Sequence, residues 1–249
     1  MTKKYEVQYM TRPEIKEHIK NKGTAILPIG STEQHGPHLP LGTDTMIAKE
    51  MALRLAKRIE AVVYPPIPIG YTWVWRDIPG NLYISIEHLK GMIKDIVRNL
   101  DRNNLKKLII VNAHGANDSS IKYAIRELTD EIDLDIYYFT YPALDKIKDK
   151  IDSKLWHGML HAEEIETSMI LAIDEDLCDM DKAVSEYPAD DISYNYHHSN
   201  LPMGALSESG VFGDATKASS KKGEVIFKIT VDHMQEVIEK AEESKDFKK

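Results

Sequence analysis

Four short apolar runs alternate with longer amphipathic stretches along the first 140 residues. The runs cover residues 24–30, 61–67, 107–112 and 134–140. After the first three of them, and over similar lengths, apolar side chains recur at helical spacing within 45–59, 86–100 and 117–132. Strands of a parallel sheet are buried on both faces, which explains apolar runs that are continuous rather than alternating. The pattern predicts an α/β fold of three layers, α/β/α, in which helices cover both faces of a mainly parallel central sheet.

The alternation of apolar runs and amphipathic stretches does not continue after residue 150. One more helix is expected over 163–173, and a long helical pattern closes the chain from about residue 224 to 243. Between them, residues 174–223 are rich in polar, aromatic and glycine residues, including Tyr194 and Tyr196. Loops of this length in a compact domain are usually functional or mediate assembly. The sequence contains no repeat, linker or low-complexity tract, so we expect a single domain over residues 1–249.

Composition and charge argue against several classes of function. The formal net charge is −8 and the predicted pI is near 5.7, without the basic face typical of nucleic-acid-binding proteins. One cysteine, Cys178, allows neither an intramolecular disulfide nor a cysteine-rich metal site. The N-terminal residues lack the apolar run of a signal peptide, and no stretch has the length of a membrane span. We therefore expect a soluble, cytoplasmic protein that acts on a small molecule rather than on nucleic acid or a membrane.

Two of the predicted strands lead directly into side chains that bind metals. The first leads to Glu33, His35, His38 and Asp44, and the third leads to His114. The carboxyl ends of parallel strands lie at one edge of a sheet, where ligands bind. Imidazole and carboxylate suit zinc, manganese or iron(II), and a binuclear site needs a carboxylate that bridges two ions about 3.5–4 Å apart. On the pattern alone, these residues also fit an ordinary loop, with Asp44 as the N-cap of the next helix.

A third polar cluster begins at His161, at the start of the next predicted helix. Two of its acids, Glu163 and Glu164, are favoured there by the helix dipole alone. Glu166 differs, because it lies beside an apolar stripe that continues through Met169. We expect Glu166 to point inward, where a buried carboxylate needs a partner such as a metal ion.

The three clusters together resemble the creatininase (creatinine amidohydrolase) family. The run from Leu27 to Asp44 carries the most specific motif. The stretch Asn112–Asn117 is similar to the family's Asn-Gly-His-Gly-Gly-Asn, and His161–Ser168 looks like its His-Ala-Gly-x-x-Glu-Thr-Ser. Weaker matches occur at Ile78–Gly80 and Gly210–Asp214, so the resemblance covers roughly residues 10 to 240 and implies a creatininase-like fold.

The resemblance implies two divalent metal ions per chain, which would be zinc, manganese or iron. By position, the ligands would be Glu33, Asp44 and His114 for one ion and His35 and Asp44 for the other, with Asp44 as the bridge. In creatininase itself, a glutamate two residues after the histidine that matches His114 completes the second site. That position is Ala116 here, and Glu166 is the natural replacement, either as a ligand or as an acid–base group.

Substrate contacts are expected from residues near these ligands. His161 matches a family residue that contacts substrate and helps to move protons, and we expect a contact from His38 as well. Trp73, Trp75 and Arg76 occupy a segment in which relatives often carry a serine and a histidine, which indicates a remodelled pocket. The arginine would suit an anionic or polyhydroxylated substrate, although ordinary packing also explains the two tryptophans.

The implied activity is hydrolysis of a non-peptide C–N bond, in a cyclic amide or a formamide of a small polar molecule. Other family members open a cyclic polyhydroxy ketone of the inosose type by C–C hydrolysis, deformylate a formamidopyrimidine or trim peptides. The same activated water serves all of these reactions. Outside the enzymes, the alternative is an inactive oligomeric binding protein, which the presence of all four matched ligands disfavours. Because family members assemble as hexamers, we expect a homo-oligomer.

Overall fold

A parallel sheet of four strands forms the centre of the computed structural model, which describes residues 2–189, 198, 200 and 207–245. The strands are β1 (Thr24–Ile29), β2 (Val62–Val63), β3 (Lys107–Asn112) and β4 (Asp135–Thr140), in the order β2-β1-β3-β4. β1 and β3 pair along their whole length, so that Ile29 lies beside Asn112, and Asn112 lies beside Thr140 of β4. The three long strands therefore end together at one edge of the sheet.

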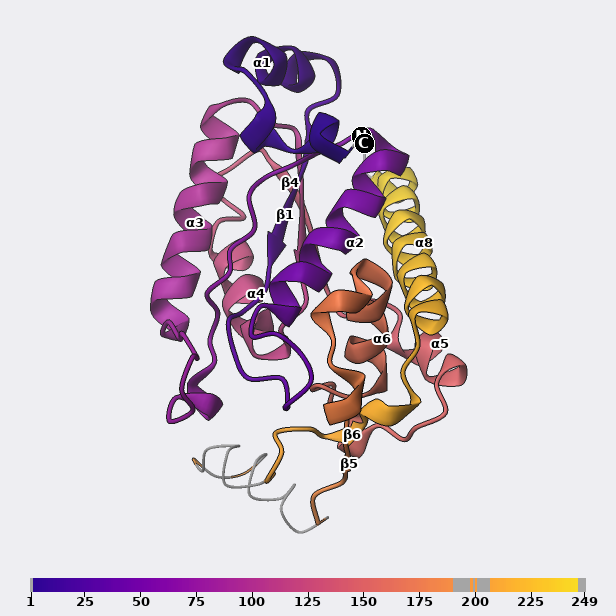
Figure 1. Cartoon of the computed structure of the whole chain (residues 1–249). Coiled ribbons are helices and arrows are strands. Elements are labelled where there is room, and N and C mark those ends of the chain that lie inside the picture. Colours follow the sequence, from indigo (N-terminus) through magenta and orange to yellow (C-terminus); the bar gives the residue numbers. More distant parts are fainter. Residues whose placement is uncertain (1, 190–197, 199, 201–206, 246–249) are drawn as a thin grey trace.

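Helices cover both faces of this sheet (Figure 1). One face carries α2 (Thr43–Ile59), α6 (Glu164–Ile173) and α8 (Ser220–Lys245), and the other carries α3 (Ile86–Arg102) and α4 (Asp118–Glu127). A hydrophobic core lies on each face of the sheet, and successive residues of a strand point into opposite cores. Ile26 and Ile109 pack with the first group of helices, whereas Leu27 and Leu108 pack with the second. The three-layer α/β/α fold predicted from the apolar runs is thereby confirmed.

Three of the differences from the predicted pattern have a local cause in the sequence. β2 stops at Val63, because the prolines at 65 and 66 lack the amide hydrogens that a ladder needs. α4 ends at Glu127 rather than near residue 132, just before the poor helix formers Thr129 and Asp130. α1 (Arg12–Asn21) was not predicted, because none of its residues is buried and its apolar pattern is weak.

Shorter elements lie near the sheet edge where the long strands end. They are α5 (Leu144–Ile147), the antiparallel pair β5 (Ser185–Glu186) and β6 (Gly213–Asp214), and 3-10 turns that include Trp73–Trp75 and Trp156–Gly158. Tyr194 and Tyr196, which belong to the segment 174–223 expected to be functional or to mediate assembly, lie outside the described residues. Within the described part of the chain, no helix combines the length and the apolar character needed to cross a bilayer.

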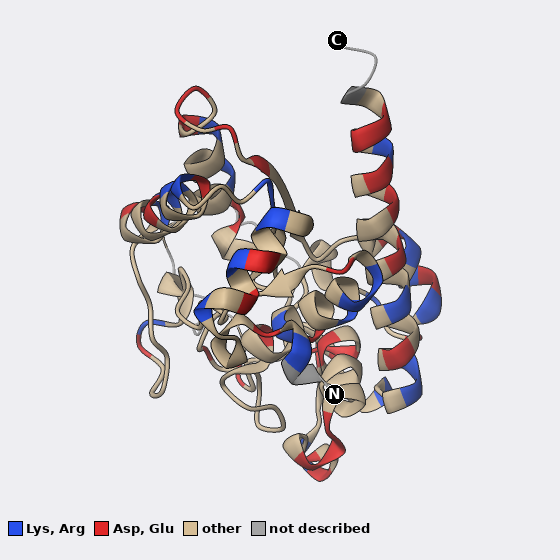
Figure 2. Cartoon of the chain, turned by 90° about the horizontal axis from the view of Figure 1, so that it is seen from above, with Lys and Arg blue, Asp and Glu red and all other residues tan. Residues whose placement is uncertain are grey.

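Charged residues of both signs are interspersed over the outer helices (Figure 2). Arg54 binds Glu50 and Glu224, and Arg58 binds Asp232, so ion pairs join α2 to α8. Pairs as exposed as these stabilise a fold by roughly 0–1 kcal/mol each. The contact between the two helices therefore depends mainly on their buried apolar faces.

Candidate metal centre

The end of β1 lies against the start of α2, and this contact positions Asp44. A β-carbon on Gly30 would lie 2.4 Å from the amide nitrogen of Thr45, so only glycine allows the approach. Ser31 Oγ donates a hydrogen bond of 2.7 Å to Asp44 Oδ2, and Thr45 Oγ1 donates one of 2.9 Å to the Ser31 carbonyl. Asp44 is consequently fixed in the first turn of α2, and the N-cap is Gly42.

Asn117 joins three loops around the site. Its Nδ2 donates to the Gly30 carbonyl at 3.0 Å and to Asn112 Oδ1 at 3.2 Å, and its Oδ1 accepts from the Tyr71 amide at 2.9 Å. The Tyr71 carbonyl in turn accepts a hydrogen bond of 3.0 Å from His114 Nε2. One buried amide thus fixes the ends of β1 and β3 relative to the segment that begins at Tyr71, and that segment is held through its main chain.

Glu33, Asp44 and His114 form the first group of candidate ligands. His114 Nδ1 lies 3.1 Å from Glu33 Oε1 and 3.0 Å from Asp44 Oδ2. His114 Nε2 faces the Tyr71 carbonyl, which can only accept, so Nε2 carries a hydrogen and Nδ1 of the neutral ring offers a lone pair. A lone pair that faces two carboxylate oxygens requires positive charge between them.

The other oxygen of Asp44 belongs to a second group, with His35 and Glu166. His35 Nε2 lies 2.9 Å from Asp44 Oδ1 and 3.6 Å from Glu166 Oε2. This nitrogen is buried and has no partner with hydrogen-bond geometry among the described residues. His35 Nδ1 donates to the Glu33 carbonyl at 3.1 Å, so Nε2 of the neutral ring also offers a lone pair.

The separations within both groups fit divalent ions. Ligand atoms about 2.0–2.2 Å from one zinc ion lie roughly 3–3.6 Å from each other. The four separations given above run from 2.9 to 3.6 Å. Both imidazoles give their other N–H to a main-chain carbonyl, as metal-bound histidines commonly do. The residues present could therefore hold two ions, one in each group, with one oxygen of Asp44 in each.

The charges at this place also favour a cation. Three buried carboxylates face two imidazoles, and burial raises the pKa of Glu33 and of Glu166. Burial by itself lowers the pKa of His35, but the neighbouring carboxylates, Asp44 first, outweigh it and raise that pKa to about 10. The surroundings thus strongly stabilise positive charge, which divalent ions would supply.

Glu166 is held by two donors, one of which was not predicted. The side chain is 1% exposed, which confirms that it points inward. Its Oε1 accepts from the Tyr141 hydroxyl, and its Oε2 accepts from the Ala162 amide at 2.5 Å. Tyr141 directly follows Thr140, the last residue of β4. Its place beyond a third strand end on the same sheet edge is the signal that could have identified it.

The other two acids of the cluster have local structural contacts. Glu163 is the N-cap of α6 and accepts from the amides of Ile165 and Glu166, and Glu164 binds Lys222. The helix-start explanation therefore holds for Glu163. Burial, together with the charge of Glu166, raises the pKa of Glu163 to about 8.

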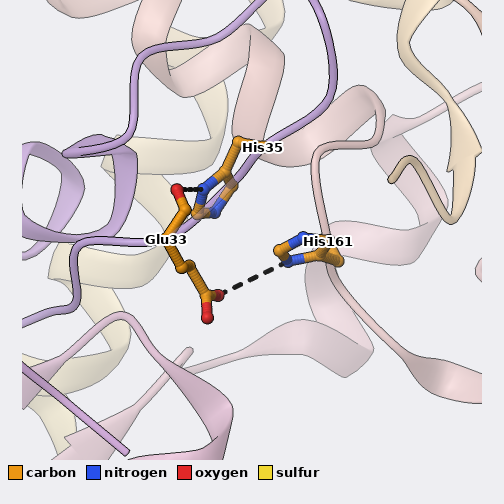
Figure 3. A group of neighbouring side chains, drawn as sticks. All are labelled: Glu33, His35 and His161. Carbon is orange, nitrogen blue, oxygen red and sulfur yellow. Dashed lines mark hydrogen bonds and ion pairs between the residues drawn. The ribbon is translucent and has the colours of Figure 1, made fainter. Parts of the chain in front are cut away.

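A cavity of about 400 Å³ opens over both groups of ligands. Its walls include Glu33, Asp44, His114 and Glu166, the predicted residues Trp75 and His161, and Ala116, Tyr141 and Met159. Trp75 stacks on the His161 ring, with 4.8 Å between ring centroids and 21° between planes. Figure 3 shows the Glu33 carboxylate facing a ring nitrogen of His161, at 3.6 Å, while the Glu33 carbonyl faces His35. Burial, followed by the neighbouring imidazole of His35, lowers the pKa of His161 well below its usual range.

Three predicted substrate contacts do not line this cavity. His38 is buried and bonds to Thr167 Oγ1 at 2.9 Å, and its pKa is lowered to about 4 by burial and by a neighbouring imidazole. Arg76 is exposed and stacks on Trp73 at 4.0 Å from the ring centroid, with Asp77 3.8 Å away. The geometry therefore gives no support to substrate contacts by His38, Trp73 or Arg76.

Known proteins with a similar sequence or fold match most of this chain. A family model described as creatinine amidohydrolase matches residues 8–238. Creatinine amidohydrolase from Pseudomonas putida is 29% identical over 229 residues, which cover 86% of this chain and 87% of that protein. A 3-dehydro-scyllo-inosose hydrolase from Thermotoga maritima is 26% identical over 254 residues, covering 93% of this chain and 81% of that protein.

Solved structures extend the similarity to three dimensions. A mutant creatininase of the zinc–zinc type and a manganese creatininase each superpose with a TM-score of 0.81 at 26% identity. Both matches cover 95% of this chain and 98% of the solved chain.

Proposed function

This chain belongs to the creatininase family and is a metal-dependent hydrolase, and we propose that it cleaves a non-peptide C–N bond in a small polar molecule. The bond would be part of a cyclic amide or a formamide. One observation carries the proposal: Asp44 divides its two oxygens between two groups of buried ligand atoms. That arrangement suits a pair of ions that share one carboxylate.

The proposed ligands follow from these groups. They are Glu33, Asp44 and His114 for one ion and His35, Asp44 and Glu166 for the other. Both oxygens of Glu166 already accept hydrogen bonds, which supports a fixed ligand rather than a mobile acid–base group. The zinc–zinc and manganese forms of solved creatininases support zinc or manganese as the ions.

The residues around the cavity supply the rest of the chemistry. When bound, the two ions would make hydroxide available near neutral pH and polarise a carbonyl oxygen. Trp75 and Met159 form walls that limit the access of water to a bound substrate. His161 lines the same cavity and directs a ring nitrogen to within 3.6 Å of Glu33 Oε1.

A second candidate is the ring-opening C–C hydrolysis of a cyclic polyhydroxy ketone. The relative from Thermotoga maritima, an inosose hydrolase that matches 93% of this chain, favours it. The ligand groups fit both reactions, since both need an activated water and a polarised carbonyl. Burial and convergence of all five proposed ligands argue against an inactive binding protein.

We further propose a single domain over residues 1–249, which the match of the family model to residues 8–238 supports. Assembly into a homo-oligomer stays a prediction.

The test combines metal analysis with a substrate panel. Protein reconstituted with zinc or manganese should hold about two ions per chain, as a two-metal site requires. It should hydrolyse one class among cyclic amides, formamides, short peptides and cyclic polyol ketones. Glu166→Gln should lose metal and activity, whereas Glu175→Gln, the same change at an exposed position, should lose neither. A protein that binds neither ion and shows no thermal shift with them would contradict the proposal.

A further inference from the structure

The amide of Gln34 lies between His161 and two main-chain groups. Its Oε1 accepts from the Gly36 amide at 2.9 Å, and its Nε2 donates to the Gly210 carbonyl at 3.1 Å. The same Nε2 lies 2.7 Å from His161 Nε2. Turning the amide over would place its oxygen against a carbonyl and its NH2 against an N–H, and both main-chain hydrogen bonds would be lost. The two main-chain partners therefore settle which end of the Gln34 amide faces His161.

That orientation determines where His161 carries its hydrogen. An amide nitrogen can only donate, so His161 Nε2 must accept and the neutral ring has its hydrogen on Nδ1. We infer that Gln34 holds the neutral His161 ring as its Nδ1–H tautomer, which makes His161 a hydrogen-bond donor to the substrate rather than a metal ligand. The tautomer follows from contacts within the chain, and only the reference to a substrate rests on the proposed function.

The tautomer separates His161 from the two ligand histidines. Glu33, His35 and His161 form a third group close enough to hold an ion. His161 Nδ1, which faces Glu33, could bind an ion only through a lone pair, and there it carries a hydrogen instead. In His35 and His114, by contrast, the nitrogen that faces the carboxylates has the lone pair. The other nitrogen, Nδ1 of His35 and Nε2 of His114, donates its hydrogen to a main-chain carbonyl. The third group is therefore no metal site, and two ions remain.

Two aromatic rings hold the His161 ring in this position. The ring has little freedom to turn away, because Trp75 stacks on one face and Phe212 lies edge-on at 6.0 Å between centroids. His161 thus keeps its Nδ1 hydrogen and can direct it at a carbonyl oxygen that gains charge. A fixed donor of this kind typically contributes about 100- to 1,000-fold to kcat.

The backbone at Gly210 independently supports the position of the Gln34 side-chain amide. Its φ is +83°, and a β-carbon there would lie 2.0 Å from Gln34 Oε1. The backbone is thus shaped so that the Gln34 amide can lie directly against it. Gln34 is a positioning residue, and it acts through His161.

The tautomer can be measured directly by 15N NMR of zinc-loaded protein labelled in its histidine rings. The His161 signals are identified by their loss in His161→Asn. At a pH at which the ring is neutral, we expect the wild type to have a hydrogen on Nδ1 and none on Nε2. An Nε2–H tautomer would overturn the inference, whether or not the protein hydrolyses any substrate.

A substitution tests whether Gln34 is the cause. Gln34→Glu keeps an acceptor for Gly36 but offers His161 a carboxylate, which can only accept. The hydrogen of the neutral ring should therefore move to Nε2, and kcat should fall by about 100-fold because the donor at Nδ1 is lost. Gln235→Glu, the same change on α8, should leave the His161 signals as in the wild type. An unchanged Nδ1–H tautomer in folded Gln34→Glu would contradict the role of Gln34. Should that variant not fold, the wild-type measurement decides alone. Absence of turnover with the expected tautomer would contradict only the proposed function.

Discussion

Asp44→Asn distinguishes one shared two-metal centre from two unrelated sites. The variant preserves the size of the side chain and an oxygen that can accept from Ser31. It removes the charge that both groups of ligand atoms use, because Oδ1 lies 2.9 Å from His35 Nε2 and Oδ2 lies 3.0 Å from His114 Nδ1. Both metals should therefore be lost together. Glu33→Gln and Glu166→Gln, each confined to one group, should weaken one metal each.

The size of the effect follows from the number of sites. An ion present at about 1,000 times its Kd stabilises the folded state by about 4 kcal/mol per site, so two sites give about 8 kcal/mol. In a chain of this length each kcal/mol raises Tm by about 2–4 °C, so saturating zinc should raise the Tm of the wild type by roughly 16–32 °C. The single-site variants should show about half of this rise, and Asp44→Asn should show almost none.

Thermal unfolding of chelator-treated protein, with and without added zinc, measures these shifts, and elemental analysis gives the metal content of the same samples. Asp130→Asn, the same change at an exposed position, serves as the control and should respond as the wild type does. Two bound ions in Asp44→Asn, or the loss of only one, would refute a bridging carboxylate. A full zinc response in Glu166→Gln would remove Glu166 from the ligand set.

Three further outcomes follow from neighbouring contacts. Tyr141→Phe removes the hydroxyl that donates to Glu166, so metal affinity should fall by about 10- to 100-fold in a chelator competition, and an unchanged affinity would show that this contact is dispensable. Trp75→Ala should lower the free energy of unfolding, measured in urea, by about 3–5 kcal/mol and should also lower kcat. Trp75→Phe should retain most of the stability and most of kcat, because a ring still covers His161. Equal losses in the two variants would rule out stacking as the cause. The pKa of Glu163 is raised from 4.5 to about 8, so its stabilising contribution is complete below pH 4.5 and is lost as the pH rises through about 8. Metal-free Glu163→Gln should therefore gain stability relative to the wild type across that window, and parallel pH curves would contradict the shift.

The strand ends made much of the site predictable. Continuous apolar runs indicated a parallel sheet, and parallel strands in register bring Glu33 and His114 to the same edge. The stripe of core residues after Glu166 correctly indicated that it points inward. These predictions succeeded because each depends on periodicity or on strand direction, both of which are local properties of the sequence.

Contacts between distant loops could not be predicted in this way. The Gln34 side chain lies 2.7 Å from His161, 127 positions later. The segment around Arg76 depends on the Asn81 side chain, which donates to the carbonyls of Trp75 and Ile78. Such contacts are set by tertiary packing, so the sequence placed Arg76 in the pocket while the fold leaves it exposed.

Tyr71 is fixed through its amide and its carbonyl, and this has a consequence for how the family diversifies. Its side chain takes no part in that anchor, so the cavity-lining side chain at Val74 can change while Asn117 and His114 keep their places. Substrate preference and metal retention can then evolve separately. Variants at Val74, with Gly30, Trp75 and Asn117 kept constant, should still bind metal but differ in the molecules they accept.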